Sequence, residues 1–478
     1  RSGDHDRPFF YCSNGSPPLP LISTCKEESL MSTERQESKL IRNIGFWPLM
    51  GIAYGQIIGA GIMTQTGIAI GMTGTGVVLA YIISAVCTTF QNFPTAILGA
   101  TVPVSGGEYR YISRLRGKKW GFVYLATYVV SKLTIALYAL SCASYLVAFL
   151  TGISEQIIAI CLLVAAFAIN LLGTKQSAFV TTGITALLLL GMALFLFYGL
   201  PRTDIAYVFD PSNLMAHGPG NLLSAIALLS FATGGAQVIG NMGSEIIDPQ
   251  KNMPKVIIIS TVTVGIMYAL VAMVASGVLP LEVVSNQNLS LVAADVMPGW
   301  AFTYFTLAAG AGATAKSLNV TLSWSPKPIL IACDDGMLPR SWGTVSKRGV
   351  PYKILIAFFF IGLIPLLAGM DISLISKMGT AISLLSKLMF SYAFLNLPKK
   401  YPEAFARSEM KVSEGTVKIL GYGSIILSAI FSASLIIELP TAAKIGFVIV
   451  FAASIAWANS GKLDKIEIPN DLDVQYVK

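Results

Sequence analysis

The sequence is poor in charged residues. Only 12% of its 478 residues are Asp, Glu, Lys or Arg, whereas 54% are hydrophobic, and a soluble domain carries about 25% charged residues. No charged residue occurs between positions 43 and 107, and the stretches 211–244, 256–281 and 354–370 also lack them. A helix needs about 20 apolar residues to cross a bilayer. The sequence therefore excludes a soluble globular protein and predicts an all-α polytopic membrane protein.

Histidine and cysteine are scarce as well. The two histidines are His5 and His217, and the six cysteines show neither the spacing of a metal site nor that of a disulfide framework. A membrane enzyme would need His, Cys or carboxylates clustered within the spans. We therefore expect no enzymatic activity, no cofactor and no metal.

The apolar runs predict twelve transmembrane helices. They cover residues 45–70, 76–100, 120–150, 153–173, 175–199, 219–246, 254–279, 298–333, 352–370, 372–397, 415–437 and 441–459. Basic residues gather in alternate loops, at 110–119, 251–255, 340–353 and 399–411, which by the positive-inside rule places both termini in the cytoplasm. We expect these residues to face anionic lipid at the plasma membrane. They explain the net charge of +8 without nucleic acid.

The two ends of the chain are polar. Residues 1–43 predict a disordered cytoplasmic tail or an added leader, with Met31 as the candidate initiator, since the chain opens with Arg1. Residues 460–478 predict a cytoplasmic C-terminal tail.

Two spans carry glycines where an ordinary membrane helix would not. The first reads GQIIGAGIM over residues 55–63, and the sixth reads FATGGAQ over residues 231–237. Unwound backbone survives in a membrane only where it lines a cavity, and broken helices at matching places in two halves indicate a transporter's binding site. Close helix packing is the alternative explanation. Because five helices is an odd number, two five-helix halves would have inverted topologies.

The chain resembles the amino acid–polyamine–organocation superfamily over residues 40–460. The resemblance rests on four motifs in order: IGAGIM at 58–63, PVSGGEY at 103–109, FATGGAQ with EIIDPQKNMP at 231–254, and DDGMLPR at 334–340. It implies the LeuT-type fold. The first inverted repeat would span residues 44–199 and the second 219–397, with two extra helices at 415–459.

The resemblance and the charge of the backbone groups at the breaks lead to the same expectation of how an amino acid would be bound. The free amides at the first break suit a carboxylate, and carbonyls at the end of the other broken half-helix suit an α-ammonium group. The predicted substrate-binding residues are Ile58, Gly59, Ala60, Gly61, Phe231, Ala232, Thr233, Gly234 and Gly235. Phe231 matches the family's outer gate. Because the family's Tyr and Trp are Thr233 and Ala236 here, we expect a wider or more polar side-chain pocket.

Six lysines lie in or at the spans, namely Lys132, Lys175, Lys316, Lys327, Lys377 and Lys387, and no acidic residue lies deep in any span. Lys175 matches a family lysine that stands where sodium-coupled relatives bind sodium. The resemblance thus implies sodium-independent transport, by proton coupling or by exchange, and interfacial snorkelling is the alternative. Lys327 should mark the inner end of the eighth helix, and Lys377 and Lys387 should snorkel from the tenth. Lys132 and Lys316 have no assigned role, although a role with an acidic substrate is open.

A secondary active transporter of L-amino acids by alternating access is the function predicted. Neutral substrates are favoured because a carrier of cations would place a carboxylate in its pocket. Acidic amino acids or related organic anions are the alternative, and a channel-like pore is the alternative of another class. The loop at 151–155 lacks the cysteine through which light-chain relatives bind a glycoprotein. We therefore expect a monomer in the bilayer, without a disulfide-linked heavy chain.

Overall fold

The computed structural model describes residues 44–468 and residue 472, except 105, 174–177 and 244. Among these residues there are helices and turns but no strand, and a single bridge joins Ile44 to Ile246. The described residues belong to one compact unit by their contacts. The predicted tail at 1–43 lies outside the described residues.

The first part of the chain forms helices that run to residue 199. They are α2 (Phe46–Ile57), η1 (Gly61–Gln65), α3 (Thr66–Thr73), η2 (Gly74–Gly76), α4 (Val77–Thr101), α5 (Gly107–Arg116), α6 (Lys118–Ser131), α7 (Thr134–Leu146), α8 (Glu155–Leu171) and α9 (Ala178–Gly199). The short elements η3 (Leu200–Arg202), α10 (Ile205–Val208) and α11 (Pro211–Leu214) follow before the second part begins.

The second part repeats this mixture of long and interrupted helices. It comprises α12 (Gly218–Ala232), η4 (Gly235–Asn241), α13 (Pro249–Gly277), α14 (Leu281–Val284), α15 (Ser290–Val296), α16 (Gly299–Tyr304), η5 (Phe305–Ala311), α17 (Gly312–Trp324), α18 (Pro326–Asp334), η6 (Arg340–Gly343), α19 (Tyr352–Leu367) and α20 (Ile372–Phe394). The chain ends with α21 (Leu397–Lys400), α22 (Pro402–Arg407), α23 (Glu414–Glu438), α24 (Thr441–Ala458) and η7 (Lys462–Lys465).

Eight helical stretches of the described chain are long and apolar enough to cross a membrane, and one of them, Phe46–Thr101, contains the first two predicted spans. The shorter apolar helices Glu155–Leu171 and Tyr352–Leu367 lie at the predicted fourth and ninth spans. The protein is thus a multi-pass helical membrane protein. The count of twelve, the repeat boundaries and the inverted symmetry stay predictions.

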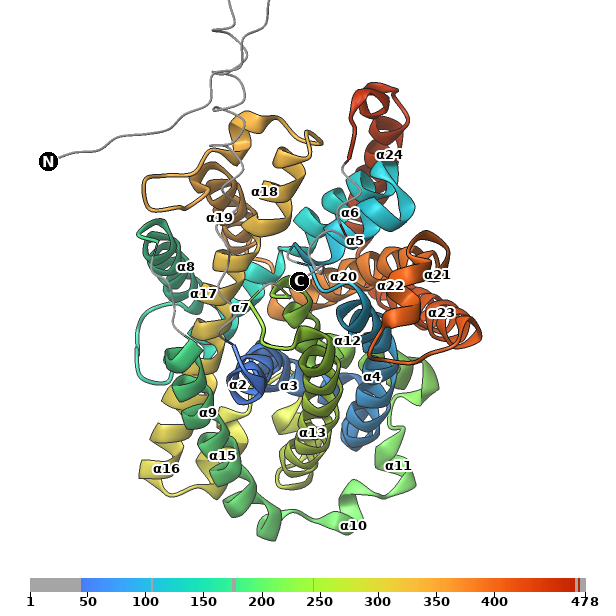
Figure 1. Ribbon diagram of the computed structural model, residues 1–478. Helices are drawn as coiled ribbons and strands as arrows, with labels where there is room; N and C mark the ends of the chain where they lie inside the picture. The colour runs from blue at the N-terminus through green and yellow to red at the C-terminus, as the bar shows by residue number, and fades with distance from the viewer. Residues whose placement is uncertain (1–43, 105, 174–177, 244, 469–471, 473–478) are drawn as a thin grey trace, which may run out of the picture. The chain divides into compact units, whose positions relative to one another are not determined.

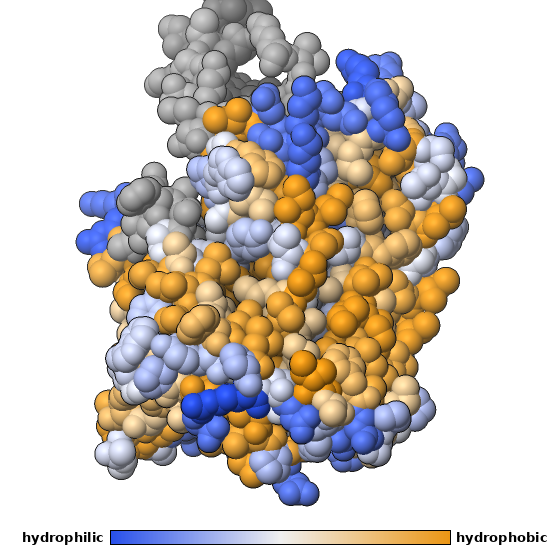
Figure 2. Space-filling model, turned by 90° about the horizontal axis from the view of Figure 1, so that it is seen from below, coloured by the Kyte–Doolittle hydropathy of each residue, from blue (hydrophilic) through white to orange (hydrophobic). Residues whose placement is uncertain are grey.

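The surface has the character expected beside lipid. Large apolar side chains are exposed on several helices. Ile437 on α23 is 72% exposed, and Phe197 on α9 is 71% exposed. Figure 2 shows hydrophobic residues across the middle of one face, with hydrophilic residues gathered near its edges. A soluble monomer rarely exposes so large a continuous apolar area, so this band is the surface that contacts the bilayer.

Both predicted helix breaks are confirmed. Helix α2 ends at Ile57, and the chain bends at residues 58 and 59 before η1 and α3 continue. Helix α12 ends at Ala232, and after a turn the chain continues as the 3-10 helix η4. Figure 1 shows α2 and α3 at the centre of the bundle, beside α12 and α13.

Glycine is required at these breaks because the two broken helices approach each other closely. A Cβ atom on Gly61 would lie 2.5 Å from the Cα of Ala232, and one on Gly235 would lie 2.6 Å from the carbonyl oxygen of Gln56. A tyrosine hydroxyl also satisfies a backbone carbonyl at the end of α2. Tyr268 donates to the Ile57 carbonyl over 3.0 Å, as buried backbone groups in a membrane require.

The third predicted span, residues 120–150, is also interrupted, which the sequence did not indicate. Helix α6 ends at Ser131 and α7 starts at Thr134, with Lys132 and Leu133 in the turn between them. The Lys132 amide donates to the Val129 carbonyl over 3.1 Å instead of continuing the α-helical pattern. Lys132 therefore stands at a mid-span break.

A buried ion pair joins α5 to the end of α18. Arg114 donates from both terminal nitrogens to Asp335, over 2.5 and 2.8 Å, and the two side chains are 2% and 6% exposed. The Tyr109 hydroxyl donates to the same carboxylate over 2.8 Å. This bidentate geometry is the strong form of the interaction, and it fixes two segments that are far apart in sequence.

Replacing Asp335 with alanine should destabilise the protein markedly. Removing one partner of a buried pair leaves an uncompensated charge and costs about 3–5 kcal/mol. Asp334→Ala is the matched control, because Asp334 is the neighbouring carboxylate and is exposed. Thermal unfolding of both purified variants checks this. Equal melting temperatures for the two would show that the pair does not stabilise the fold.

Candidate functional site

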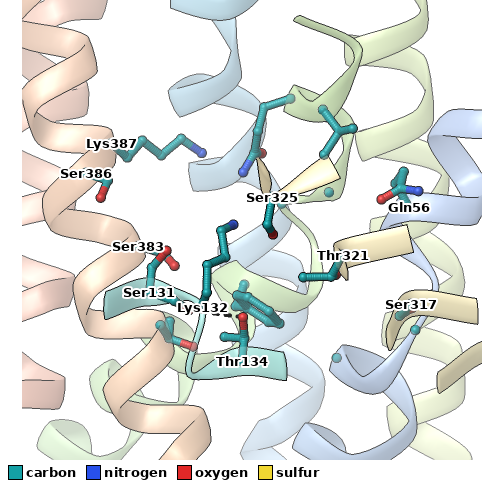
Figure 3. Close-up of a pocket in the computed structure, with 18 of the residues that line it drawn as sticks. Gln56, Ser131, Lys132, Thr134, Ser317, Thr321, Ser325, Ser383, Ser386 and Lys387 are labelled. Carbon is teal, nitrogen blue, oxygen red and sulfur yellow. Dashed lines mark hydrogen bonds between the residues drawn. The ribbon is translucent and has the colours of Figure 1, made fainter. Parts of the chain in front are cut away.

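A cavity of about 230 Å³ lies where the two broken helices meet. Seven of the nine predicted substrate-binding residues line it: Gly59, Ala60, Gly61, Phe231, Ala232, Gly234 and Gly235. The rest of the wall comes from helices α4, α5, α6, α7, α17, α18 and α20 and residues beside them, and Figure 3 shows labelled polar side chains around the space. The sequence thus predicted the part of the cavity's lining that lies at the two helix breaks, although binding itself stays a prediction.

The remaining predicted residues lie elsewhere. Ile58 is fully buried and does not line the cavity. The hydroxyl of Thr233 forms a 2.9 Å hydrogen bond with that of Thr88 on α4, and Thr233 does not line the cavity. The expected effect of Thr233 and Ala236 on the width or polarity of the pocket stays a prediction. Lys175 lies outside the described residues.

The broken helices present opposite backbone charges to the cavity. Gly59, Ala60 and Gly61 stand where the second half of the first helix begins, and the first amides of a helix lack intrahelical partners and suit an anion. Phe231 and Ala232 end α12, where the last carbonyls suit a cation. A molecule with adjacent carboxylate and ammonium groups fits this arrangement.

Apolar side chains form another part of the wall. Phe231 and Tyr138 lie with ring centroids 6.4 Å apart, and Val320, Trp324 and Leu384 also line the cavity. Phe231 is only partly buried, and the gate role implied by the resemblance stays a prediction. These groups can receive an uncharged side chain.

Three lining residues hold buried polar atoms without a partner in the described structure. They are Gln91 Oε1, Gln237 Oε1 and Thr380 Oγ1. Buried polar atoms are almost always hydrogen-bonded, so three exceptions at one cavity indicate a place for a ligand or water. Of these, Gln237 belongs to the sixth-helix motif and could have been found from the sequence, whereas Gln91 and Thr380 carry no sequence signal.

The cavity also holds a carboxylate, which corrects the sequence-based argument about charge. Glu108 belongs to α5, between the spans, yet it lines the cavity, where the Tyr124 hydroxyl donates to it over 3.0 Å. Burial raises the pKa of the Glu108 carboxyl, against the lowering by Tyr124, Lys387 and Lys132. The absence of a pocket carboxylate therefore no longer argues against cationic substrates. The two lysines that line the cavity, Lys132 and Lys387, now provide the argument against cationic substrates.

The span lysines are not equivalent in the structure. Lys132 and Lys387 line the cavity, and the expectation that Lys387 snorkels is wrong, since it is 8% exposed and donates to Asn92 Oδ1 over 3.1 Å. Lys377 pairs with Glu438 over 2.7 Å, and the Lys327 ammonium lies 4.6 Å from the centre of the Trp324 ring. Lys316 is buried, and its ammonium has no partner in the described structure.

A multi-pass helical protein with a solute-sized polar cavity at two interrupted helices has the architecture of a secondary transporter. The family model described as amino acid permease matches residues 44–458. The chain therefore belongs to the amino acid permease family, within the amino acid–polyamine–organocation superfamily.

Similar proteins carry related names. The branched-chain amino acid permease BcaP of Bacillus subtilis is 25% identical over 79% of this chain and 85% of its own length. An uncharacterized transporter of Mycobacterium tuberculosis is 29% identical over 66% of this chain and 71% of its own. The large neutral amino acids transporter small subunit 2 of Mus musculus is 28% identical over 66% of this chain and 63% of its own. These relatives are named as permeases and transporters, which are not enzymes.

Proposed function

We propose that the protein is a secondary active transporter that carries L-amino acids by alternating access. The observation that carries this proposal is the cavity at the two breaks, which offers helix-start amides and helix-end carbonyls to one small space. The substrate's α-carboxylate lies at Gly59, Ala60 and Gly61, and its α-ammonium lies at the end of α12. Phe231 closes over it from the outer side.

Neutral amino acids are the first candidate substrates. The apolar wall of Phe231, Tyr138, Val320 and Leu384 supports this choice, and so do the relatives named for branched-chain and large neutral amino acids. Acidic amino acids are the second candidate, because two lysines and one glutamate line the cavity.

Transport is sodium-independent and either proton-coupled or exchanging. This part rests on the resemblance that places the Lys175 ammonium where sodium-coupled relatives hold sodium. The protein lies in the plasma membrane with both termini in the cytoplasm, as the basic loops support. It works as a monomer without a disulfide-linked heavy chain, since the loop at 151–155 offers no cysteine.

A thermal-shift screen of the twenty amino acids on purified protein tests this proposal. A ligand that binds only the folded state stabilises it by mass action and so raises the melting temperature. The stabilisation is about 2.7 kcal/mol at a ligand concentration of a hundred times its Kd. We expect a few neutral L-amino acids to stabilise the protein and their D-enantiomers to have no effect. Stabilisation by none of the twenty would contradict an amino acid site.

A further inference from the structure

Two ammonium groups enter the central cavity from opposite helices. Lys132, at the break between α6 and α7, places its nitrogen 4.2 Å from the centre of the Tyr128 ring. Lys387 reaches the cavity from α20, and its nitrogen donates to Asn92 on α4. Figure 3 shows both side chains directed into the same space.

The cavity carries an excess of positive charge. Glu108 is the sole carboxylate among its described lining residues, and in the described structure no ion pair joins it to either lysine. With both lysines protonated, the net charge of the lining side chains is +1 when Glu108 is ionised and +2 when Glu108 is protonated. A buried charge without a partner of opposite sign is costly. An anion bound in this cavity would offset the excess positive charge.

Hydroxyl groups surround the two lysines. Ser131 and Thr134 flank Lys132 in sequence, and Ser383 and Ser386 stand on α20 just before Lys387. Each hydroxyl now donates to a backbone carbonyl three or four residues earlier in the chain, as Ser131 does to Tyr128 over 2.7 Å. The Ser386 hydroxyl also lies 3.2 Å from that of Thr127. Hydroxyl protons rotate, and these groups can turn to an anion held by the lysines.

We propose that Lys132 and Lys387 form an anion-binding subsite of the transport cavity, separate from the backbone amides that hold the substrate's α-carboxylate. The inference rests on the proposed function, since it adds a second anionic group to a bound amino acid. Two sources supply that chemistry. One is the side-chain carboxylate of an acidic amino acid, and the other is a small inorganic anion bound beside a neutral amino acid.

Thermal shift separates these sources on the unmodified protein. L-leucine and L-glutamate are titrated in chloride and again with chloride replaced by gluconate. Stabilisation by glutamate in both media assigns the subsite to the side-chain carboxylate. Stabilisation by leucine that falls at least tenfold in affinity without chloride assigns it to the inorganic anion. Leucine binding equally in both media, with no binding of glutamate, overturns the subsite and leaves the proposed function intact.

Lysine variants locate the effect. Lys132→Met and Lys387→Met should each weaken the anion-dependent binding at least tenfold, and Lys132→Arg should retain part of it because it keeps the charge. Lys377→Met is the matched control on α20, since Lys377 pairs with Glu438 outside the cavity. Equal loss in the control, or no loss in either cavity variant, overturns the assignment. No stabilisation by any amino acid in any medium overturns the subsite and the proposed function together.

Discussion

Replacing Gly61 with leucine should abolish amino acid binding. The Cβ atom would meet the Ala232 backbone at 2.5 Å, and the longer side chain must then displace the two broken helices or fill the space between them. Either result blocks approach of a carboxylate to the amides of the first break. We expect no thermal stabilisation by any amino acid and no uptake, while the variant still inserts in the membrane.

A matched control separates this effect from the cost of adding leucine to a membrane helix. Gly446 lies within α24, and a Cβ atom added there would meet no other atom within 4 Å. Gly446→Leu should bind and transport normally. Normal affinity in a well-folded Gly61→Leu protein would show that the substrate binds elsewhere.

Replacing Lys175 with alanine should reduce transport severely while substrate binding persists. If the Lys175 ammonium stands in place of a sodium ion, the parent protein transports with sodium replaced by choline. Alanine removes that charge. In a proton-coupled carrier the coupling of transport to proton movement is then lost, and in an exchanger the first helix loses the fixed charge that stabilises it. Initial uptake rates in proteoliposomes, with and without sodium, measure both effects. Strict sodium dependence of the parent, or full activity of Lys175→Ala, would refute the role.

Two results distinguish proton coupling from exchange. In a proton-coupled carrier Lys175 releases its proton during the cycle, so uptake rises as external pH falls and collapses with a protonophore. In an exchanger Lys175 stays charged, and counter-exchange is indifferent to the protonophore. The Lys175→Ala variant should fail in both assays.

The centre of the fold could be predicted because its chemistry is local in sequence. Mid-span glycines at 59, 61, 234 and 235 interrupt uncharged helices, and the structure places breaks there. The close approach of Gly61 to Ala232 and of Gly235 to Gln56 explains why glycine is needed at those two positions. The same glycines therefore serve packing and the cavity together, so the two explanations offered by the sequence do not exclude each other.

Other parts of the cavity could not be predicted because they depend on tertiary folding. Glu108 lies in a segment between spans, and only the packing of α5 against α6 and α20 carries it to the cavity. The break at Lys132 has no glycine or proline beside it. Lys387 faces inward or outward according to the rotation of α20, which charge content alone does not determine.

Counter-exchange in proteoliposomes tests the central claim, that this cavity carries an amino acid across the membrane by alternating access. Vesicles are loaded with the amino acid that stabilises the protein most and diluted into a trace of the same labelled compound. We expect transient accumulation of label above its equilibrium level, with an initial rate that saturates as the external concentration rises. Equilibration of the label without an overshoot, at a rate linear in concentration, would contradict alternating access and indicate a pore.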